Sequence, residues 1–351
     1  MANEQIMFYI IVPIFNVERY VRKCLDSLLT QSYTQWKAIL INDGSTDSSG
    51  EIAQEYANKD ARFVTLNQEN QGLSMARNAG LEYVKNLIIS TNPPPQQYLN
   101  YIRFVDSDDY LQSYALEHSY HILTQYEVDV LMYSIFIARE PTTYTQVEFD
   151  WQVFPSHIEG LYTPTDLILS LGGYAMIASA GSFVGKASLI FENNITFIPH
   201  IIYEDIAFCT KSVSKCKNIY ISHEQVYNYT LVPSSIMNSF VTRDKRIKIT
   251  YSYFMILQTF LHSFREEKNP VMKEYYYRAC LDNVKKLMQS LQLVGYVEEL
   301  GFSKKDLLLS LSQLNIKGKR YFCCLFPRIY GFPKRMRLAL RMYEITHLGK
   351  V

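Results

Sequence analysis

The amino-acid sequence predicts an α/β fold: a mostly parallel, doubly wound (Rossmann-like) sheet followed by a C-terminal helical region. Two observations carry this prediction. Over the first 112 residues, short apolar runs alternate with segments of helical periodicity. That alternation is typical of parallel strands joined by right-handed helical crossovers. From residue 244 onward, the sequence shows helical periodicity alone.

Four apolar runs in the first part of the chain are predicted to be buried strands. They are residues 8–15, 37–42, 62–66 and 101–105. Short continuous apolar runs are typical of strands covered on both faces. Pro13 has no N–H to donate to a neighbouring strand, so we expect it to mark the end of the first strand.

Helices are predicted between these strands. Asn16 is expected to cap the first helix, whose apolar residues recur at helical spacing. Ser48 and Glu51 match a capping box that would open the second helix. A third helix is expected over residues 73–84. The apolar face of the first helix consists of Val17, Tyr20, Val21, Cys24, Leu25 and Leu28.

Further elements are predicted beyond the first three helices. The prolines of Asn92-Pro-Pro-Pro95 favour an extended surface insertion over residues 86–100. Thr163 and Asp166 form a capping pair for a short helix. Residues 139–160 are expected to be loop and hairpin. The other predicted helices are 113–126, 204–216, 244–267, 271–293 and 304–314, and the other strands are 128–136, 218–222 and 226–231.

The composition is that of an ordinary globular protein, because 48% of its 351 residues are hydrophobic and 20% are charged. Its six cysteines form no C-x-x-C pair, which argues against a zinc site. The sequence lacks both a basic start followed by an apolar run and any run of 18 apolar residues. We therefore expect no signal peptide, no spanning helix and reduced cytoplasmic thiols.

Residues 317–351, which we call the tail, are basic and rich in aromatics. The tail holds nine Lys or Arg and one acid, a net charge of +8 in a chain whose total is +1. Such an asymmetry points to an anionic partner. Two interpretations stay open: the tail binds an anionic membrane surface, or it packs on the body as a helix with its basic face in solvent. No nucleic-acid-binding motif accompanies it, so we expect no nucleic-acid partner.

Three acids, Asp106, Asp108 and Asp109, directly follow the fourth predicted strand. Crowded carboxylates repel one another, and a shared cation removes that cost. Mg²⁺ and Mn²⁺ prefer carboxylate oxygens, usually together with substrate phosphates. The carboxyl edge of an open α/β sheet is also where ligands bind. The alternative is an acidic turn with a helix cap.

Four motifs occur in order, each at a strand end, and together they resemble family 2 glycosyltransferases of the GT-A fold and the bacterial surface-glycan type. The resemblance is strong over residues 6–112 and looser over 200–236. Any one of the motifs would be a weak signal, so their order makes the signal specific. The motifs are Pro13-Ile-Phe-Asn16, Asn42-Asp43-Gly-Ser-Thr-Asp47, Asn70-Gln-Gly72-Leu-Ser-Met-Ala76-Arg77-Asn78-Ala-Gly80 and Asp106-Ser-Asp108-Asp109.

The resemblance implies a site for a nucleotide-sugar donor. Asp43 would accept an N–H of a uracil base, the alternative being an ordinary turn before a helix. Asn16 and Glu18 would reach the ribose, although helix capping accounts equally well for Asn16. Arg77 would offset the diphosphate charge, or would form a surface salt bridge. The donor-binding candidates are Pro13, Phe15, Asn16, Glu18, Asp43, Arg77, Asp106 and Ser107.

The resemblance also implies a metal and a general base. Asp108 is the candidate direct ligand of Mn²⁺ or Mg²⁺. Asp106 would lie near the metal and the ribose or sugar, and Asp109 would be a ligand, an outer-sphere group or a helix cap. Asp205 is the candidate general base, and Glu204 would orient it or contact the acceptor. Two acids at a helix start are also favoured by the helix dipole alone.

From this resemblance we expect an inverting, metal-dependent glycosyltransferase. It would move one hexose or N-acetylhexosamine from a UDP-sugar to a hydroxyl of a growing surface glycan, such as a lipid-linked oligosaccharide, lipooligosaccharide or capsule. A sugar nucleotidyltransferase is the first alternative, but it would open with a Gly-rich loop after strand one. A non-catalytic glycan- or membrane-binding relative is the second, but the acids at 43, 106, 108 and 205 are all retained.

The sequence divides into four predicted segments. Residues 1–112 would be the nucleotide-sugar-binding half of the GT-A domain, and 113–240 the half that binds the acceptor and carries the base. Residues 241–316 would be a helical extension, followed by the tail at 317–351. We expect a cytoplasmic protein, which would be peripheral on the inner face of the plasma membrane under the first of the two interpretations of the tail.

Overall fold

The computed structural model describes residues 5–90, 98–133, 136–138, 154–173, 177–230 and 242–314. The chain divides into two compact units, residues 1–239 and 240–351, and each is described by itself. The tail and most of the loop expected at 139–160 lie outside the described residues, so their predictions stay predictions.

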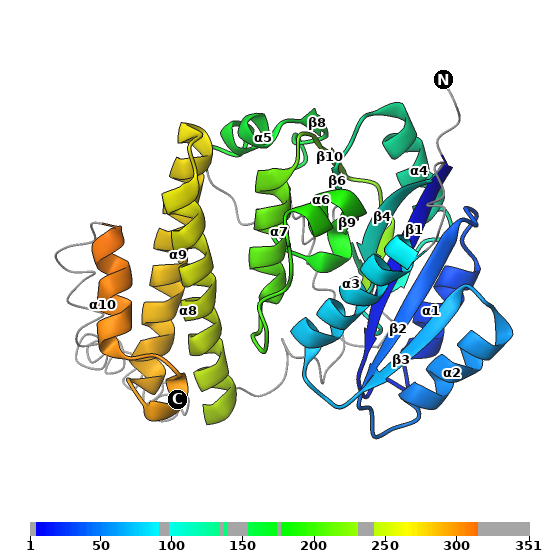
Figure 1. Cartoon of the computed structure of the whole chain (residues 1–351), viewed down its shortest axis with the longest axis horizontal. Helices are drawn as coiled ribbons and strands as arrows, with labels where there is room; N and C mark the ends of the chain where they lie inside the picture. Colours follow the sequence, from blue (N-terminus) through cyan, green and yellow to red (C-terminus); the bar gives the residue numbers. More distant parts are fainter. Residues whose placement is uncertain are drawn as a thin grey trace, which may run out of the picture. The chain divides into compact units, whose positions relative to one another are not determined.

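The described residues of the first unit form an eight-stranded sheet in the order β3-β2-β1-β4-β9-β6-β10-β8 (Figure 1). The strands are β1 Gln5–Ile14, β2 Trp36–Asp43, β3 Phe63–Gln68, β4 Tyr98–Phe104, β6 Val130–Tyr133, β8 Gly160–Tyr162, β9 Phe183–Lys186 and β10 Ile219–Ser222. All run in one direction except β8 and β9, which are antiparallel to their neighbours. The mostly parallel sheet is therefore confirmed, whereas β9, between β4 and β6, was not predicted.

A second, three-stranded sheet lies in the order β5-β11-β7 among the described residues. Its strands are β5 Tyr110–Leu111, β7 Phe136–Ala138 and β11 Tyr227–Thr230. β11 pairs antiparallel with β5 and parallel with β7. Because β5 follows the acidic motif directly, this small sheet fixes where that motif ends.

The helices of the first unit are α1 Val21–Leu29, α2 Ser49–Lys59, α3 Leu73–Ser90, α4 Ala115–Gln125, α5 Pro164–Ser170, the 3₁₀ turn η1 Ala180–Ser182, α6 Ala187–Glu192 and α7 Glu204–Lys215.

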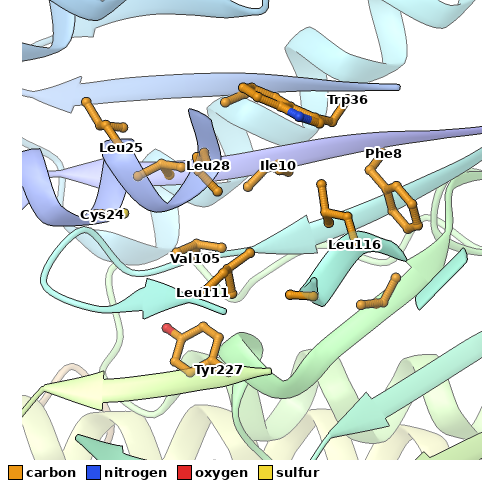
Figure 2. Close-up of a cluster of buried hydrophobic side chains, with 14 of the residues drawn as sticks. Phe8, Ile10, Cys24, Leu25, Leu28, Trp36, Val105, Leu111, Leu116 and Tyr227 are labelled. Carbon is orange, nitrogen blue, oxygen red and sulfur yellow. The ribbon is translucent and has the colours of Figure 1, made fainter. Parts of the chain in front are cut away.

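Helices cover both faces of the main sheet, which is why β1 and β2 are apolar almost throughout. On one face, Phe8 and Ile10 of β1 share a buried cluster with α1 and α4, through residues such as Leu25 and Leu116 (Figure 2). On the other face, α3 approaches closely at Gly80. A Cβ there would lie 2.6 Å from Cγ2 of Ile11, so only glycine fits without moving the strand side chains.

Two predicted helix caps are wrong, and for the same physical reason. α1 begins at Val21, and the side chain of Asn16 accepts a hydrogen bond from the Thr46 N–H at 2.8 Å. α2 begins after Ser48, but that side chain makes no capping hydrogen bond. The Ser48 N–H donates instead to Oε2 of Glu18 at 3.1 Å. The loops after β1 and β2 therefore form hydrogen bonds with each other instead of capping the helices that follow them.

Other boundaries differ by little from the prediction. β1 continues one residue beyond Pro13, pairing with β2 as far as Ile14, after its pairing with β4 has ended opposite Ile11. α3 extends to Ser90, so a helix occupies the first part of the predicted insertion at 86–100. The Thr163–Asp166 cap is confirmed, because the Asp166 N–H donates to Oγ1 of Thr163 at 3.2 Å.

The described part of the second unit is helical, as predicted. Its elements are α8 Arg243–Glu266, α9 Pro270–Val294, the 3₁₀ turn η2 Glu298–Leu300 and α10 Lys304–Gln313. Thr242, Asn269 and Ser303 cap the three α-helices through their side chains. Among the residues that the structure describes, no helix is both long and apolar enough to cross a bilayer.

Candidate functional site

The loops after β1 and β2 meet at the carboxyl edge of the main sheet. Besides the two contacts that replace the helix caps, the Glu18 N–H donates to Oδ2 of Asp47 at 3.1 Å. Pro13 is buried within the strand, whereas Phe15, at its end, keeps 45% of its surface exposed. The edge therefore presents a flat aromatic ring beside a rigid pair of loops.

Asp43, at the end of β2, is only 2% exposed and organises the loop before α3. Its Oδ1 accepts from Nε2 of Gln68 at 2.7 Å and from the Gln71 N–H at 2.9 Å, and its Oδ2 accepts from the Gly72 N–H at 2.8 Å. A carboxylate offers about four acceptor positions, and these bonds use three of them. Among the bonds to described residues, one acceptor position, on Oδ2, is not used.

The acidic motif folds into a tight turn after β4, closed by a hydrogen bond of 3.0 Å from the Asp109 N–H to the Asp106 carbonyl. Asp106 and Asp108 remain partly exposed, while Ser107 and Asp109 are buried. Burial and the two neighbouring acids raise the pKa of Asp109 well above its ordinary range. Because α4 begins only at Ala115, the alternative of Asp109 as a helix cap is wrong.

Asp106 and Asp108 are the two acids of the motif that remain partly open to solvent, and their oxygens are of the kind that a hard divalent cation prefers. Burial, together with the nearby charge of Asp106, raises the pKa of Asp108 to about 6. A cation between the two would offset that repulsion. Among the described residues, no group of three or more His, Cys, Asp or Glu is arranged to hold a metal. Asp106 and Asp108 alone could offer a cation two carboxylates, and Mg²⁺ commonly takes one or two together with phosphates and water.

Arg77 of α3 joins the acidic turn to the start of α7. Its Nη2 donates to Oδ1 of Asp106 at 2.6 Å, and its Nη1 pairs with Oε1 of Glu204. Its side chain is only 3% exposed, so the alternative of a surface salt bridge is wrong. Burial alone would lower the pKa of Arg77, but the surrounding carboxylates outweigh it and raise that pKa. Both terminal nitrogens are held by carboxylates, so the guanidinium links the two acidic motifs.

One face of α3 also fastens the segment that leads into α7. Asn78 exchanges two hydrogen bonds of 2.9 Å with the backbone of Phe197. One turn earlier, the Ser74 hydroxyl donates to the Ile201 carbonyl at 3.0 Å. The sequence argument did not assign either residue, although their spacing of four on a helix is the signal that could have found them.

Glu204 and Asp205 open α7 after Tyr203, whose backbone is left-handed with φ of 63°. Glu204 is buried, and the loss of hydration raises its pKa to about 7 despite the attraction of Arg77. Asp205 is half-buried, and its pKa is raised mainly by burial. Its Oδ2 accepts the Ser179 N–H at 2.8 Å. Each acid has a specific partner, which the helix dipole alone would not require.

Ser179 is a residue that sequence reasoning missed, and nothing in its neighbourhood signals it. Its φ of 88° is unusual for a non-glycine residue. Such a backbone costs on the order of 1–3 kcal/mol and persists where the surrounding structure enforces it. Here it directs the Ser179 amide at Asp205, which fixes one oxygen of that carboxylate.

Replacing Arg77 with Met should destabilise the protein by about 3–5 kcal/mol at pH 8, because buried Glu204 would then either bear a charge without a partner or take up a proton far above its pKa in the unfolded chain. The loss should shrink at pH 5. Without Arg77 the pKa of Glu204 rises further, so the group is neutral there and little charge is buried. Urea unfolding at both pH values measures this. Arg22→Met, which breaks the exposed pair with Glu55, is the control and should change stability little at either pH. Equal losses in the two variants would contradict the buried-pair account.

Residues 9–180 match the model of the family described as glycosyl transferase family 2. The chain is 43% identical over 121 residues to the glycosyltransferase GlyA of Streptococcus pneumoniae, covering 34% of this chain and 16% of that protein. It is 27% identical over 231 residues to the poly(ribitol-phosphate) beta-glucosyltransferase of Bacillus spizizenii, covering 63% of this chain and 31% of that protein. The chain thus spans less than a third of the length of these two relatives.

Two solved structures share the fold. S. aureus TarS, residues 1–349 in complex with UDP-GlcNAc, superposes with a TM-score of 0.61 at 19% identity, covering 88% of this chain and 82% of that one. The mannosyltransferase PcManGT from Pyrobaculum calidifontis, in complex with GDP-Man and Mn²⁺, gives a TM-score of 0.52 at 14% identity, covering 93% and 88%. At these identities the likeness establishes the GT-A-type fold alone.

Proposed function

The chain belongs to glycosyl transferase family 2, and from that premise we propose that it is an inverting, metal-dependent glycosyltransferase. It moves one hexose or N-acetylhexosamine from a UDP-sugar to a hydroxyl of a growing bacterial surface glycan. The donor class is supported by the UDP-GlcNAc complex of TarS, and the acceptor class by the relative named for poly(ribitol-phosphate).

The observation that carries the proposal is the Arg77 bridge. Through it, Asp106 of the acidic turn and Glu204 of α7 share one buried guanidinium. Residues far apart in the sequence, in the turn after β4 and at the start of α7, are therefore adjacent at one site. A site for single-displacement transfer needs this pairing, because a cation must face the leaving group while a base faces the attacking hydroxyl.

The donor would lie along the carboxyl edge of the sheet. Asp43 accepts an N–H of the uracil ring at its remaining acceptor position, and the exposed ring of Phe15 stacks on the base. Asn16 and Glu18 frame the ribose from the loop after β1. Ser107, buried between the two open acids, would lie next to the diphosphate as part of the donor site.

Asp106 and Asp108 would hold Mn²⁺ or Mg²⁺ together with the donor diphosphate, and PcManGT with bound Mn²⁺ supports this choice of metal. When bound, the metal neutralises the charge that develops on the departing diphosphate. Arg77, paired with two carboxylates, positions Asp106 and does not itself carry the diphosphate.

In the transfer step, Asp205 takes the proton from the acceptor hydroxyl as its oxygen attacks the anomeric carbon. The bond between that carbon and the diphosphate oxygen breaks, and UDP leaves from the opposite face with the electron pair. Attack and departure on opposite faces invert the anomeric centre. The raised pKa of Asp205 makes it a stronger base than an ordinary aspartate.

The tail would bring the enzyme to lipid-linked acceptors at an anionic membrane. Its net charge of +8 is the support for this proposal, because each basic residue near such a surface contributes about 1 kcal/mol. Sedimentation with liposomes tests it. Full-length protein should pellet with anionic lipid and release at high salt, and a chain ending at Ile316 should stay in solution. Equal pelleting of both forms would exclude the anchor.

The function is tested by thermal shift and by product analysis. UDP-sugars with Mn²⁺ should raise the melting temperature, since a ligand that binds the native state stabilises it by mass action. GDP-mannose should not. The productive donor should then be hydrolysed slowly to sugar and UDP, with the released sugar first appearing as the inverted anomer by NMR. A nucleotidyltransferase would instead release pyrophosphate from a nucleoside triphosphate and a sugar phosphate. A non-catalytic relative would bind without turnover.

A further inference from the structure

Asp109 is the acid of the motif that faces away from the other two. Its Oδ2 accepts a hydrogen bond of 2.6 Å from the Tyr227 hydroxyl, and its Oδ1 accepts one of 2.8 Å from the Thr230 N–H. Both partners belong to β11, more than a hundred residues later in the chain. Asp109 is only 1% exposed. A carboxylate committed on both oxygens to buried donors is poorly placed to bind a cation directly.

The Tyr227 hydroxyl holds both ends of the acidic turn. It donates to Asp109, the last residue of the turn, and accepts the N–H of Asp106, the first residue, at 3.2 Å. Since Asp106 and Asp108 lie on this turn, its shape sets the direction of their carboxylates.

The ring of Tyr227 has little freedom to move. It is 1% exposed and lies in the buried cluster with Val105 and Leu111 (Figure 2). On another side it meets Gly181, where an added Cβ would lie 2.5 Å from the ring carbon Cζ. Pairing of Tyr227 with Leu111 across β11 and β5 fixes the backbone as well.

We propose that Tyr227 is a positioning residue, whose hydroxyl holds the Asp106–Asp109 turn in the form that presents Asp106 and Asp108 to the metal. The inference rests on the proposed function, because it assigns the scaffold of the same site. Asp109 is then an outer-sphere group that orients the turn rather than a ligand. Groups of this kind typically change metal affinity by about 10–100-fold when they are lost.

The test compares two full-length variants that each lose one buried hydroxyl. Tyr227→Phe removes the hydroxyl that holds the turn and keeps the ring. Tyr133→Phe is the matched control. Tyr133 is fully buried, and its hydroxyl contacts His118 and Ser119 instead of the acidic turn. Mn²⁺ binding in the presence of UDP is measured by electron paramagnetic resonance, alongside the melting temperature of each protein.

Tyr227→Phe should raise the Mn²⁺ dissociation constant by about 10–100-fold, and excess Mn²⁺ should restore most of the turnover. Tyr133→Phe should lose a similar amount of thermal stability with wild-type Mn²⁺ affinity. Wild-type Mn²⁺ affinity in Tyr227→Phe would overturn the inference and leave the proposed function standing. Absence of Mn²⁺ and UDP binding in the unaltered protein would overturn both.

A second variant keeps the proposal testable if Tyr227→Phe folds poorly. Gly181→Ala keeps the hydroxyl group, but the added Cβ would lie 2.5 Å from Cζ and 2.8 Å from the hydroxyl oxygen of Tyr227, so it displaces the ring and the hydroxyl together. It should weaken Mn²⁺ binding in the same direction as the loss of the hydroxyl. Unchanged binding in a folded Gly181→Ala protein would overturn the positioning role.

Discussion

Replacing Asp108 with Asn should lower glycosyl transfer by about 10²–10³-fold while the protein stays folded. An amide has nearly the shape of the carboxylate but lacks its charge, so a hard cation loses a principal ligand. A single electrostatic group that acts on the developing charge of a transition state is typically worth this much. The raised pKa of Asp108 implies that its charge is unfavourable without a cation, so the neutral variant should be at least as stable as the unaltered protein.

The measurement is turnover with the productive UDP-sugar at saturating Mn²⁺, together with the melting temperature with and without metal. Asp60→Asn is a control of the same chemistry, because Asp60 pairs with Arg62 in a turn outside the site. It should leave transfer unchanged. Full activity of Asp108→Asn, or of the unaltered protein in excess chelator, would remove the metal-dependent mechanism.

Local sequence patterns predicted the elements of the fold well where a run stands between clear boundaries. The alternation of strands and helices up to Phe104 and the helices from Arg243 onward both follow from periodicity. β9 was missed because it is only four residues long and is followed at once by α6. No local signal indicates that such a run enters the middle of a sheet antiparallel to its neighbours.

The errors at Asn16 and Ser48 have one origin. Both residues are good helix caps by type, but each lies in a loop whose hydrogen-bond partners come from another loop. Asn16 receives the Thr46 N–H, and the Ser48 N–H donates to Glu18. Tertiary contacts between the β1 and β2 loops therefore took the place of local capping.

In the site, too, the sequence indicated the types of residue but not their contacts. The sequence correctly indicated an acidic cluster at the end of β4, but could not tell which acid would be buried. Arg77 was interpreted as a diphosphate contact or a surface ion pair, and its partners in the structure lie in the turn after β4 and at the start of α7. Tyr227 and Ser179 act through contacts with residues that are distant in the sequence. Such contacts cannot be predicted from the spacing of residues along the chain.

The second large effect that we expect is a loss of turnover when Asp205, at the start of α7, is replaced. Asp205→Asn should keep UDP-sugar affinity near that of the unaltered protein and lower turnover by about 10²–10⁴-fold, the usual worth of a general base. Asp205 meets the Ser179 amide, and an Asn side-chain oxygen can accept the same N–H. The variant therefore preserves the local structure and removes only the basic group.

The pH profile distinguishes a base from a structural residue. A general base works when deprotonated, so turnover should rise with pH through the pKa of Asp205. Burial raises that pKa, so the rise should lie above the range of an ordinary aspartate and should vanish in Asp205→Asn. Glu204→Gln is the companion variant. Its amide oxygen can still accept from Arg77, so its loss of turnover should be the smaller of the two. If Glu204→Gln loses more turnover, or if Asp205→Asn loses donor affinity instead, the roles of these two acids are reversed or structural, and the acceptor hydroxyl must deliver its proton elsewhere.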